Sequence, residues 1–144
     1  MPVNKRNRII METAATYGKM QAESPTEVIR AIKKGLPLKA FDRLRDRLEI
    51  TEARLAGVVG IKLRTLARRK IEGRFTPEES DRIHRLMGLM DRTAEFFRSD
   101  EKAAAWLKRP QYDFNDIPPL DYADTEVGTK EVFHLLGRLE NGVF

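Results

Sequence analysis

The feature that most constrains the fold of this chain is a strong helix start at residues 76–79, followed by a long apolar repeat. Thr76 and Glu79 have the spacing of a capping box, and Pro77 stands at the first helical position, where no amide donor is needed. Apolar residues then recur at helical spacing to about residue 98: Ile83, Leu86, Met87, Met90, Ala94 and Phe97, with Leu89 and Phe96 on a second face. Such a helix either packs wholly within its own chain or leaves one face for another subunit.

Capping residues, prolines and glycines divide the rest of the chain into shorter helices. Ser24-Pro25 and Thr51 are helix starts, Asp100 is expected to cap a short helix, and Gly35 and Gly73 are helix ends. We expect helices over residues 24–35, 36–48, 51–58, 62–72, 77–98, 101–109 and 126–140. Residues 110–120 contain three prolines and are expected to be irregular, and no segment has the alternation of a strand. The sequence therefore predicts an all-α fold.

Charge is distributed unevenly along the 144 residues. Residues 30–74 hold 14 Lys and Arg against 5 Asp and Glu, a net charge of +9, whereas residues 110–144 hold 2 against 7, a net charge of −5. One region suits a polyanion that the other would repel, which favours an adaptor with two ends over a single-site enzyme. The alternative is a solvated surface that is simply uneven.

Composition also bears on the compartment. Cysteine is absent, so there is no disulfide framework, and a reducing environment is compatible. The first twenty residues lack the apolar run of a signal peptide, and no segment has the length of a membrane-spanning helix. We expect a cytoplasmic protein that does not contact a membrane.

Residues 55–70, LAGVVGIKLRTLARRK, match a helix-turn-helix. Two helices that cross steeply need a small residue at their contact and a glycine at the turn, here Ala56 and Gly60. Ile61 and Leu66 would hold the second helix on the first, and Leu55 would face the core. The spacing resembles that of phage-repressor-type, Xre-like regulators.

Seven basic residues are candidates for contacts with DNA. Lys62, Arg64 and Arg68 lie at the start and on one face of the second helix, where a recognition helix meets base edges. Phosphate contacts are predicted for Arg54, Arg69, Lys70 and Arg74. Arg69, however, falls where such motifs usually have an inward apolar residue, so the recognition helix could be shorter or rotated. The alternative is a basic helix hairpin that never touches DNA.

From about Glu52 to Phe144 the chain resembles the Xre/MbcA/ParS antitoxin family. The stretches that carry the resemblance are TLARRKIEGRFTPEESDRIHRLMGLMDRTAEFF, KAAAWLKRP and PPLDYADTEVGTKEVFHLLGRLENGVF. The resemblance implies an antitoxin that neutralises a RES-domain toxin, which degrades NAD, and that represses its own operon. It also implies that the C-terminal region covers the toxin's nucleotide pocket. The segment QYDFNDIP departs from the family, which tends to have a glycine-containing loop there.

The C-terminal region offers two kinds of candidate toxin contact. Asp121, Asp124 and Glu126 present carboxylates to a pocket that binds pyrophosphate and should be electropositive. Arg138, Glu140 and Asn141 end the last helix, and Val143 and Phe144 supply an apolar anchor. The alternative is that this helix only completes the chain's own core and that the tail frays.

Catalysis is not expected. The two histidines, His84 and His134, lie in different predicted helices without metal-ligand spacing, and there is no phosphate-binding glycine loop. We therefore predict no metal, no cofactor and no small-molecule substrate.

The sequence divides into an N-terminal segment of residues 1–24 that is expected to be mobile, a helix-turn-helix and dimerisation domain of residues 25–98, and a toxin-binding region of residues 99–144. Because so small a motif buries little surface on DNA, a homodimer is expected on two half-sites. Two alternatives stay open: a stand-alone dimeric repressor, and a protein-binding module without DNA activity.

Overall fold

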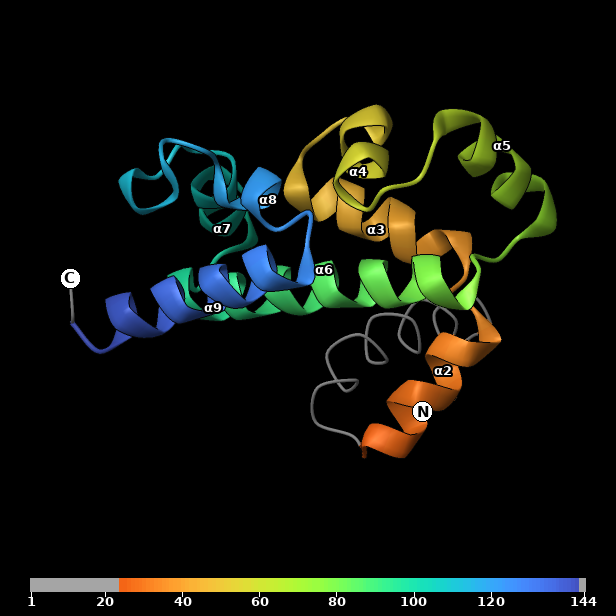
Figure 1. The fold of residues 1–144 in the computed structure, drawn as a ribbon, viewed down its shortest axis with the longest axis horizontal. Helices are drawn as coiled ribbons and strands as arrows, with labels where there is room; N and C mark the ends of the chain where they lie inside the picture. The colour runs from red at the N-terminus through yellow and green to blue at the C-terminus, as the bar shows by residue number, and fades with distance from the viewer. Residues whose placement is uncertain (1–23, 143–144) are drawn as a thin grey trace, which may run out of the picture.

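A computed structural model describes residues 24–142, and the predicted mobile segment lies almost entirely outside them. The elements are α2 (Pro25–Lys34), α3 (Leu38–Leu48), α4 (Glu52–Val58), α5 (Leu63–Glu72), α6 (Pro77–Phe97), α7 (Asp100–Leu107), the 3-10 helix η1 (Tyr112–Phe114), α8 (Pro119–Tyr122) and α9 (Glu126–Glu140) (Figure 1). Residues 24–142 contain no strand, only two isolated bridges. The prediction of an all-α fold is confirmed.

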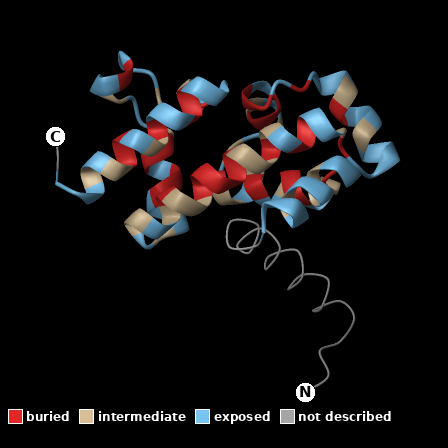
Figure 2. Ribbon diagram, turned by 60° about the horizontal axis from the view of Figure 1, so that its bottom comes forward, coloured by how far each residue is buried: buried red, intermediate tan, exposed pale blue. Residues whose placement is uncertain are grey.

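Helix α6 is the element on which the others assemble, because α2, α3, α7 and α9 all pack against it. Its capping box forms as predicted: the Thr76 hydroxyl accepts from the Glu79 amide at 3.2 Å, and the Glu79 carboxylate accepts from the Thr76 amide at 2.9 Å. Ile83, Leu89 and Met90 are fully buried within this one chain (Figure 2). The stretch from 83 to 90 therefore leaves no apolar face for another subunit.

A polar link joins three of these helices. The guanidinium of Arg47 in α3 donates to Asp91 of α6 at 2.6 Å and to Asp100 of α7 at 3.0 Å. Burial on its own lowers the pKa of Arg47, but the hydrogen bonds that its guanidinium donates to the two carboxylates outweigh burial, so the pKa lies above its ordinary value. The link fixes α3 and α7 on the same side of α6.

Two local predictions were wrong. The cap of α7 is Ser99, whose hydroxyl accepts from the Lys102 amide at 3.1 Å, and Asp100 is the first helical residue. Residues 110–120 are not irregular throughout, since η1 lies inside them and α8 begins at Pro119. The reason is burial: Phe114 is buried and stacks on Tyr122 with ring centroids 4.3 Å apart.

Candidate functional site

The two helices of the predicted helix-turn-helix are α4 and α5. Leu55, Ala56, Ile61 and Leu66 are all buried, as their spacing predicts. Gly60 makes the turn with φ +69°, a conformation that favours glycine, and the Ile61 amide donates to the Ala56 carbonyl at 2.8 Å. The motif predicted from residues 55–70 is present, with α4 packed against α3 and α5.

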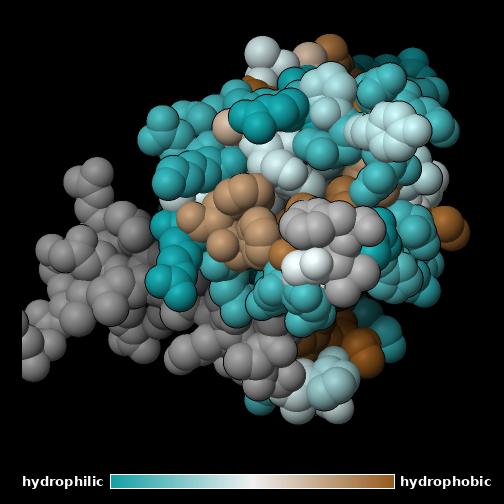
Figure 3. Space-filling model, turned by 90° about the vertical axis from the view of Figure 1, so that its left-hand side faces the viewer, coloured by the Kyte–Doolittle hydropathy of each residue, from teal (hydrophilic) through white to brown (hydrophobic). Residues whose placement is uncertain are grey.

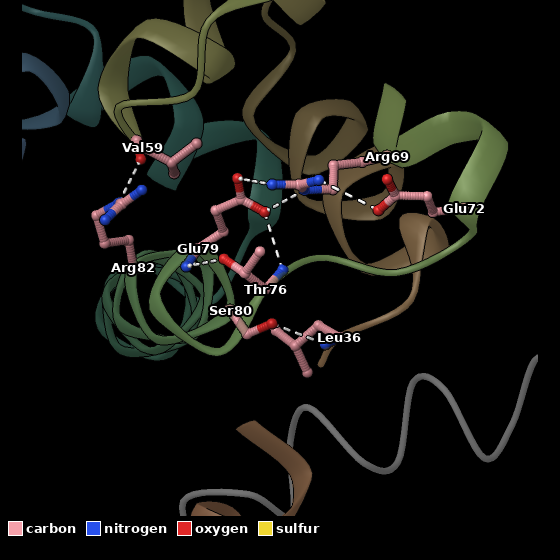
Figure 4. A network of polar contacts seen from close by, with 8 residues as sticks. All are labelled: Leu36, Val59, Arg69, Glu72, Thr76, Glu79, Ser80 and Arg82. Atoms are coloured by element: carbon pink, nitrogen blue, oxygen red, sulfur yellow. Dashed lines mark hydrogen bonds and ion pairs between the residues drawn. The ribbon is translucent and has the colours of Figure 1, made fainter. Parts of the chain in front are cut away.

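Polar side chains of α6 hold this motif in place (Figure 4). The Arg82 guanidinium donates to the Val59 carbonyl at 2.7 Å, at the end of α4. Ser80 accepts from the Leu36 amide at 2.8 Å and so ties the α2–α3 connection to the same turn of α6. Sequence reasoning missed both, because no local pattern signals a partner 23 or 44 residues away.

Arg69 is the DNA-binding candidate whose side chain lies inward, between α5 and α6. Its guanidinium donates to the two carboxylate oxygens of Glu79 at 2.7 and 3.1 Å and to Glu72 at 3.2 Å (Figure 4). Its side chain is only 11% exposed, since it lies inward between α5 and α6 where an apolar residue is usual. Arg69 therefore links α5 to α6. The phosphate contact predicted for it stays a prediction, and it would require the guanidinium to leave Glu79.

The same pair shifts two pKa values. Burial on its own raises the pKa of the Glu79 carboxyl, but hydrogen bonds from Arg69 and Thr76 outweigh burial and hold the pKa below its ordinary value. The hydrogen bond to Glu79 likewise raises the pKa of Arg69. Both groups stay charged near neutral pH, so the contact is an ion pair.

The other basic candidates fall into two groups. Lys62, Arg64 and Arg68 are exposed at the start and along α5, and none of them forms an ion pair with any residue from 24 to 142. In contrast, Arg54 contacts Asp121 at 3.4 Å, Lys70 pairs with Glu52, and Arg74 donates to the Gly35 carbonyl at 2.8 Å. The three residues predicted to contact bases are thus the ones without an ion pair among the described residues.

The acidic candidates gather where α8 meets α9. Asp121, Asp124 and Glu126 are all exposed there. Asp121 and Asp124 line a shallow surface pocket together with Arg54, so they lie beside α4 of the helix-turn-helix. Glu126 is 3.6 Å from Lys130, one turn further along α9.

The remaining candidates lie at the other end of α9. Arg138 is 3.8 Å from Asp113 of the η1 segment, Glu140 pairs with Arg92 of α6, and the Asn141 side chain donates to the Gly137 carbonyl at 2.9 Å. Val143 and Phe144 lie outside the described residues. At 1.5 Å per residue, Glu126 and Glu140 are about 21 Å apart. The structure therefore does not bring the toxin-binding candidates together in one place.

Figure 3 shows this end of the molecule, where mostly hydrophilic side chains surround a hydrophobic area. Tyr112 of η1 and Ile117 are exposed large apolar residues of the C-terminal region, at 91% and 40%. The sequence analysis did not single them out, because they lie in the proline-rich segment where no helical periodicity marks a face.

Comparisons with known proteins agree with this two-part geometry. Residues 27–88 match the family model of the antitoxin Xre-like helix-turn-helix domain, and residues 92–142 match that of the antitoxin Xre/MbcA/ParS C-terminal toxin-binding domain. An antitoxin Xre from Yersinia enterocolitica serotype O:8 is 37% identical over 127 residues, which cover 87% of this chain and 86% of that protein. The chain belongs to the Xre antitoxin family.

Two further relatives are similar along most of their length. An antitoxin Xre from Photorhabdus laumondii subsp. laumondii is 34% identical over 114 residues, 78% of this chain and 77% of that protein. A Prs ADP-ribosylating antitoxin from Sphingobium sp. is 23% identical over 138 residues, 89% of this chain and 87% of that protein. This Xre antitoxin therefore carries a helix-turn-helix domain and a toxin-binding domain.

The residues that mark the family in the sequence mainly build this fold. Gly128 shows why: a Cβ there would lie 1.7 Å from the Tyr122 carbonyl oxygen, so only glycine lets α9 begin so close to α8. Thr125 caps α9 by accepting from the Gly128 amide at 3.0 Å, and Thr129 donates to the Ala123 carbonyl at 3.1 Å. Trp106, Leu107, Pro119, Leu120 and Leu136 are also buried.

Residues 24–142 contain no group of three or more His, Asp or Glu placed to hold a metal ion. In the same part of the chain, none of the helices combines the length and apolar character needed to cross a bilayer.

Proposed function

We propose that this Xre antitoxin acts in the cytoplasm, where it neutralises a RES-domain toxin that degrades NAD and represses its own operon. The C-terminal region would cover the toxin's active site, and the helix-turn-helix would bind operator DNA as part of a homodimer. The observation that carries the proposal is the separation of the two matched domains: α5 and the end of α9 lie at opposite ends of the molecule (Figure 1). One chain can therefore hold DNA and toxin without overlap.

The DNA side of the proposal rests on Lys62, Arg64 and Arg68, which are exposed and make no described ion pair. Arg54, Lys70 and Arg74 would contact phosphates after exchanging their intramolecular partners. Without Arg69, three phosphate contacts remain per protomer, which predicts a log–log salt slope of about −2.7 for each bound protomer. A response that does not change with salt would contradict DNA binding.

Two half-sites would supply the surface that one small motif lacks, and this supports the homodimer. Because Ile83, Leu89 and Met90 of α6 are enclosed by their own chain, the subunit contact would come from other elements. The division at residues 98 and 99 also stays a prediction, since the two matched domains meet within α6.

On the toxin side, the end of α9 is held at a defined place. Glu140 pairs with Arg92 of α6, and Arg138 lies 3.8 Å from Asp113, so the end of α9 lies against α6 and η1. Glu126 presents its carboxylate at the start of α9, about 21 Å from Glu140. Asp121 on α8 and Asp124 before α9 lie at that same end of the helix. We propose the end of α9 and the tail as the part that enters the pocket, and the acidic group as a contact on its rim.

The test is intracellular NAD in cells that express the candidate toxin encoded beside this gene. The toxin is expressed alone, with the full chain, with a chain ending at Gly142, or with a chain ending at Gly137. NAD should fall with toxin alone, recover with the full chain, and stay low with the chain that ends at Gly137. The chain ending at Gly142 keeps Arg138 and Glu140 and separates their contribution from that of Val143 and Phe144.

If the chain ending at Gly137 still protects, inhibition lies in residues 110–137. A neighbour that never lowers NAD would contradict the RES assignment and favour the stand-alone repressor. The Sphingobium relative is named as an ADP-ribosylating antitoxin, so the fate of the ADP-ribose should be followed as well. Free ADP-ribose supports NAD degradation, whereas ADP-ribose attached to protein would favour a transferase as the toxin.

A further inference from the structure

Helix α5 exposes an apolar ridge that the fold does not need. Leu63 is 57% exposed and Ile71 is 89% exposed, and Ala67, midway between them, is exposed too. The three residues are spaced by four, so they lie on one face of the helix. The core is filled from another face, where Leu66 is 1% exposed. Folding alone therefore gives no reason for apolar side chains at positions 63 and 71.

Mostly positive charge lies beside the ridge, although the acidic Glu72 follows Ile71 and pairs with Arg69. Arg64 and Arg68 follow Leu63 and Ala67 directly in the sequence, so they run beside the ridge, and both are exposed. Lys62 precedes the helix and is exposed as well. Two copies of this surface would repel each other, so it does not suit a symmetric contact through the same face. A polyanion that also presents apolar groups does suit it.

Duplex DNA presents such groups in its major groove. Thymine alone among the bases carries a C5-methyl group there, and aliphatic side chains contact it, whereas arginine reads the acceptors of guanine. From Leu63 to Ile71 the ridge covers nine residues, with a rise of about 12 Å. The major groove is wide enough to admit an α-helix, so an apolar ridge on the exposed face of α5 can reach base edges there.

We propose that Leu63, Ala67 and Ile71 contact thymine methyl groups, while Arg64 and Arg68 read guanine, so that each operator half-site combines thymine with guanine. This inference rests on the proposed DNA binding and specifies the sequence class of the site. It makes Leu63 and Ile71 determinants of specificity, roles that the charged residues of α5 do not cover.

The experiment starts by selecting duplexes from a random pool with the full chain. The selected half-site is then synthesised with deoxyuridine in place of each thymine, which removes the methyl group and keeps the base pair. We expect the dissociation constant to rise about fourfold for each methyl that contacts the ridge, which is the cost of exposing one buried methyl group. Thymines outside the half-site should be insensitive.

Protein variants assign the effect to residues. Leu63→Ala and Ile71→Ala remove exposed side chains from a helix in which alanine is favoured, so folding should be kept. Each variant should bind the thymine duplex more weakly than the unchanged protein does. The same variant should bind the matching deoxyuridine duplex no more weakly than it binds the thymine duplex. Val127→Ala is the matched control, because Val127 is 72% exposed but lies on α9. It should leave both affinities unchanged.

The outcomes separate this inference from the proposed function. If no duplex is selected, DNA binding itself fails. If duplexes are selected but deoxyuridine changes nothing, DNA binding stands and the thymine contact is wrong. If Ile71→Ala changes the sedimentation of the free protein and not the discrimination between thymine and deoxyuridine, the ridge is a contact between subunits and the inference is overturned.

Discussion

The helix-turn-helix and the start of α9 are held in place by different means. Charged and polar side chains from the first turns of α6 hold the helix-turn-helix: Glu79 binds Arg69, and Arg82 binds the Val59 carbonyl. Where α8 meets α9, the contact is between backbones, with Gly128 against the Tyr122 carbonyl. The basic region thus uses part of its charge to position itself, whereas the acidic region keeps its carboxylates on the surface.

This difference teaches which residues are available to a partner. In the basic region, Arg69 is paired with Glu79. Of the candidates, only Lys62, Arg64 and Arg68 form no ion pair or side-chain hydrogen bond among the described residues. In the acidic region, Asp121 and Glu126 have only exposed partners at 3.4 and 3.6 Å. Surface ion pairs of this kind are weak and can be exchanged. Substitutions at the two kinds of anchor should therefore affect DNA binding and toxin binding separately.

The largest effect is expected from Gly128→Ala. The new Cβ would meet the Tyr122 carbonyl oxygen at 1.7 Å, so α9 must move away from α8. We expect a loss of about 3 kcal/mol in the free energy of unfolding, measured with urea, and loss of toxin neutralisation. The affinity for DNA should change by less than about twofold, since α9 packs mainly on α6 and α8 and not on α5.

Gly137→Ala is the matched control for that change. It lies in the same helix, but a Cβ there meets nothing within 4 Å. Alanine should raise stability by up to about 1 kcal/mol through its helix propensity. If Gly128→Ala weakens DNA binding as much as neutralisation, the two regions are coupled through α6 and the comparison fails.

Glu79→Ala should have the next largest effect, in the opposite region. It leaves the Arg69 guanidinium with only Glu72 and removes the acceptor of the Thr76 amide. A loss of about 2 kcal/mol is expected, together with weaker DNA binding and intact neutralisation. Glu78→Ala, an exposed change on the same turn, should cost less than about 0.5 kcal/mol.

The pKa of Glu79 adds a pH test of the same pair. Its folded pKa lies below the ordinary value of 4.5, so the folded state binds this proton less readily than the unfolded state does. The stabilisation is complete above pH 4.5 and is lost as pH falls through the folded pKa. Glu79→Ala should flatten the acid limb of a plot of stability against pH, whereas Glu78→Ala should not.

How far the sequence predicts this structure depends on the range of the interaction. Thr76, Pro77 and Glu79 predicted the start of α6, because a capping box is made within four residues. The buried positions of the helix-turn-helix also followed from local spacing, because Ala56 marks the helix contact and Gly60 marks the turn. Such signals need no knowledge of the rest of the fold.

Contacts between elements could not be predicted in the same way. The inward placement of Arg69 is intelligible only once Glu79, on the next helix, is known to face it. Residues 110–120 have the prolines of an irregular segment, yet Phe114 and Leu120 are buried by other helices and order short turns. The split of the toxin-binding candidates into two groups likewise follows from the length of α9, which separates Glu126 at its start from Arg138 near its end.

Asp121→Asn tests the one place where the two regions touch through candidate residues. It removes the carboxylate that Arg54 contacts at 3.4 Å and lowers the negative charge beside α4. DNA affinity should rise about twofold at low salt, because the pair is exposed and worth little, and the gain should vanish at high salt. Asp116→Asn, exposed near η1, is the control for a general change in charge.

The smallest effect is expected from His84, which lies on α6 between the two regions. Burial lowers the pKa of His84 and outweighs the attraction of Asp81 and Asp91, so the folded state favours the neutral ring over a range in which the unfolded state is already protonated. Stability should therefore fall as pH drops below about 6.5. His84→Gln should remove this slope, and His134→Gln, an exposed change on α9, should keep it. Because protonation of Glu79 changes the stability only below pH 4.5, one pH series separates the effects of Glu79 and His84. A slope that persists in His84→Gln would place its origin elsewhere in the chain.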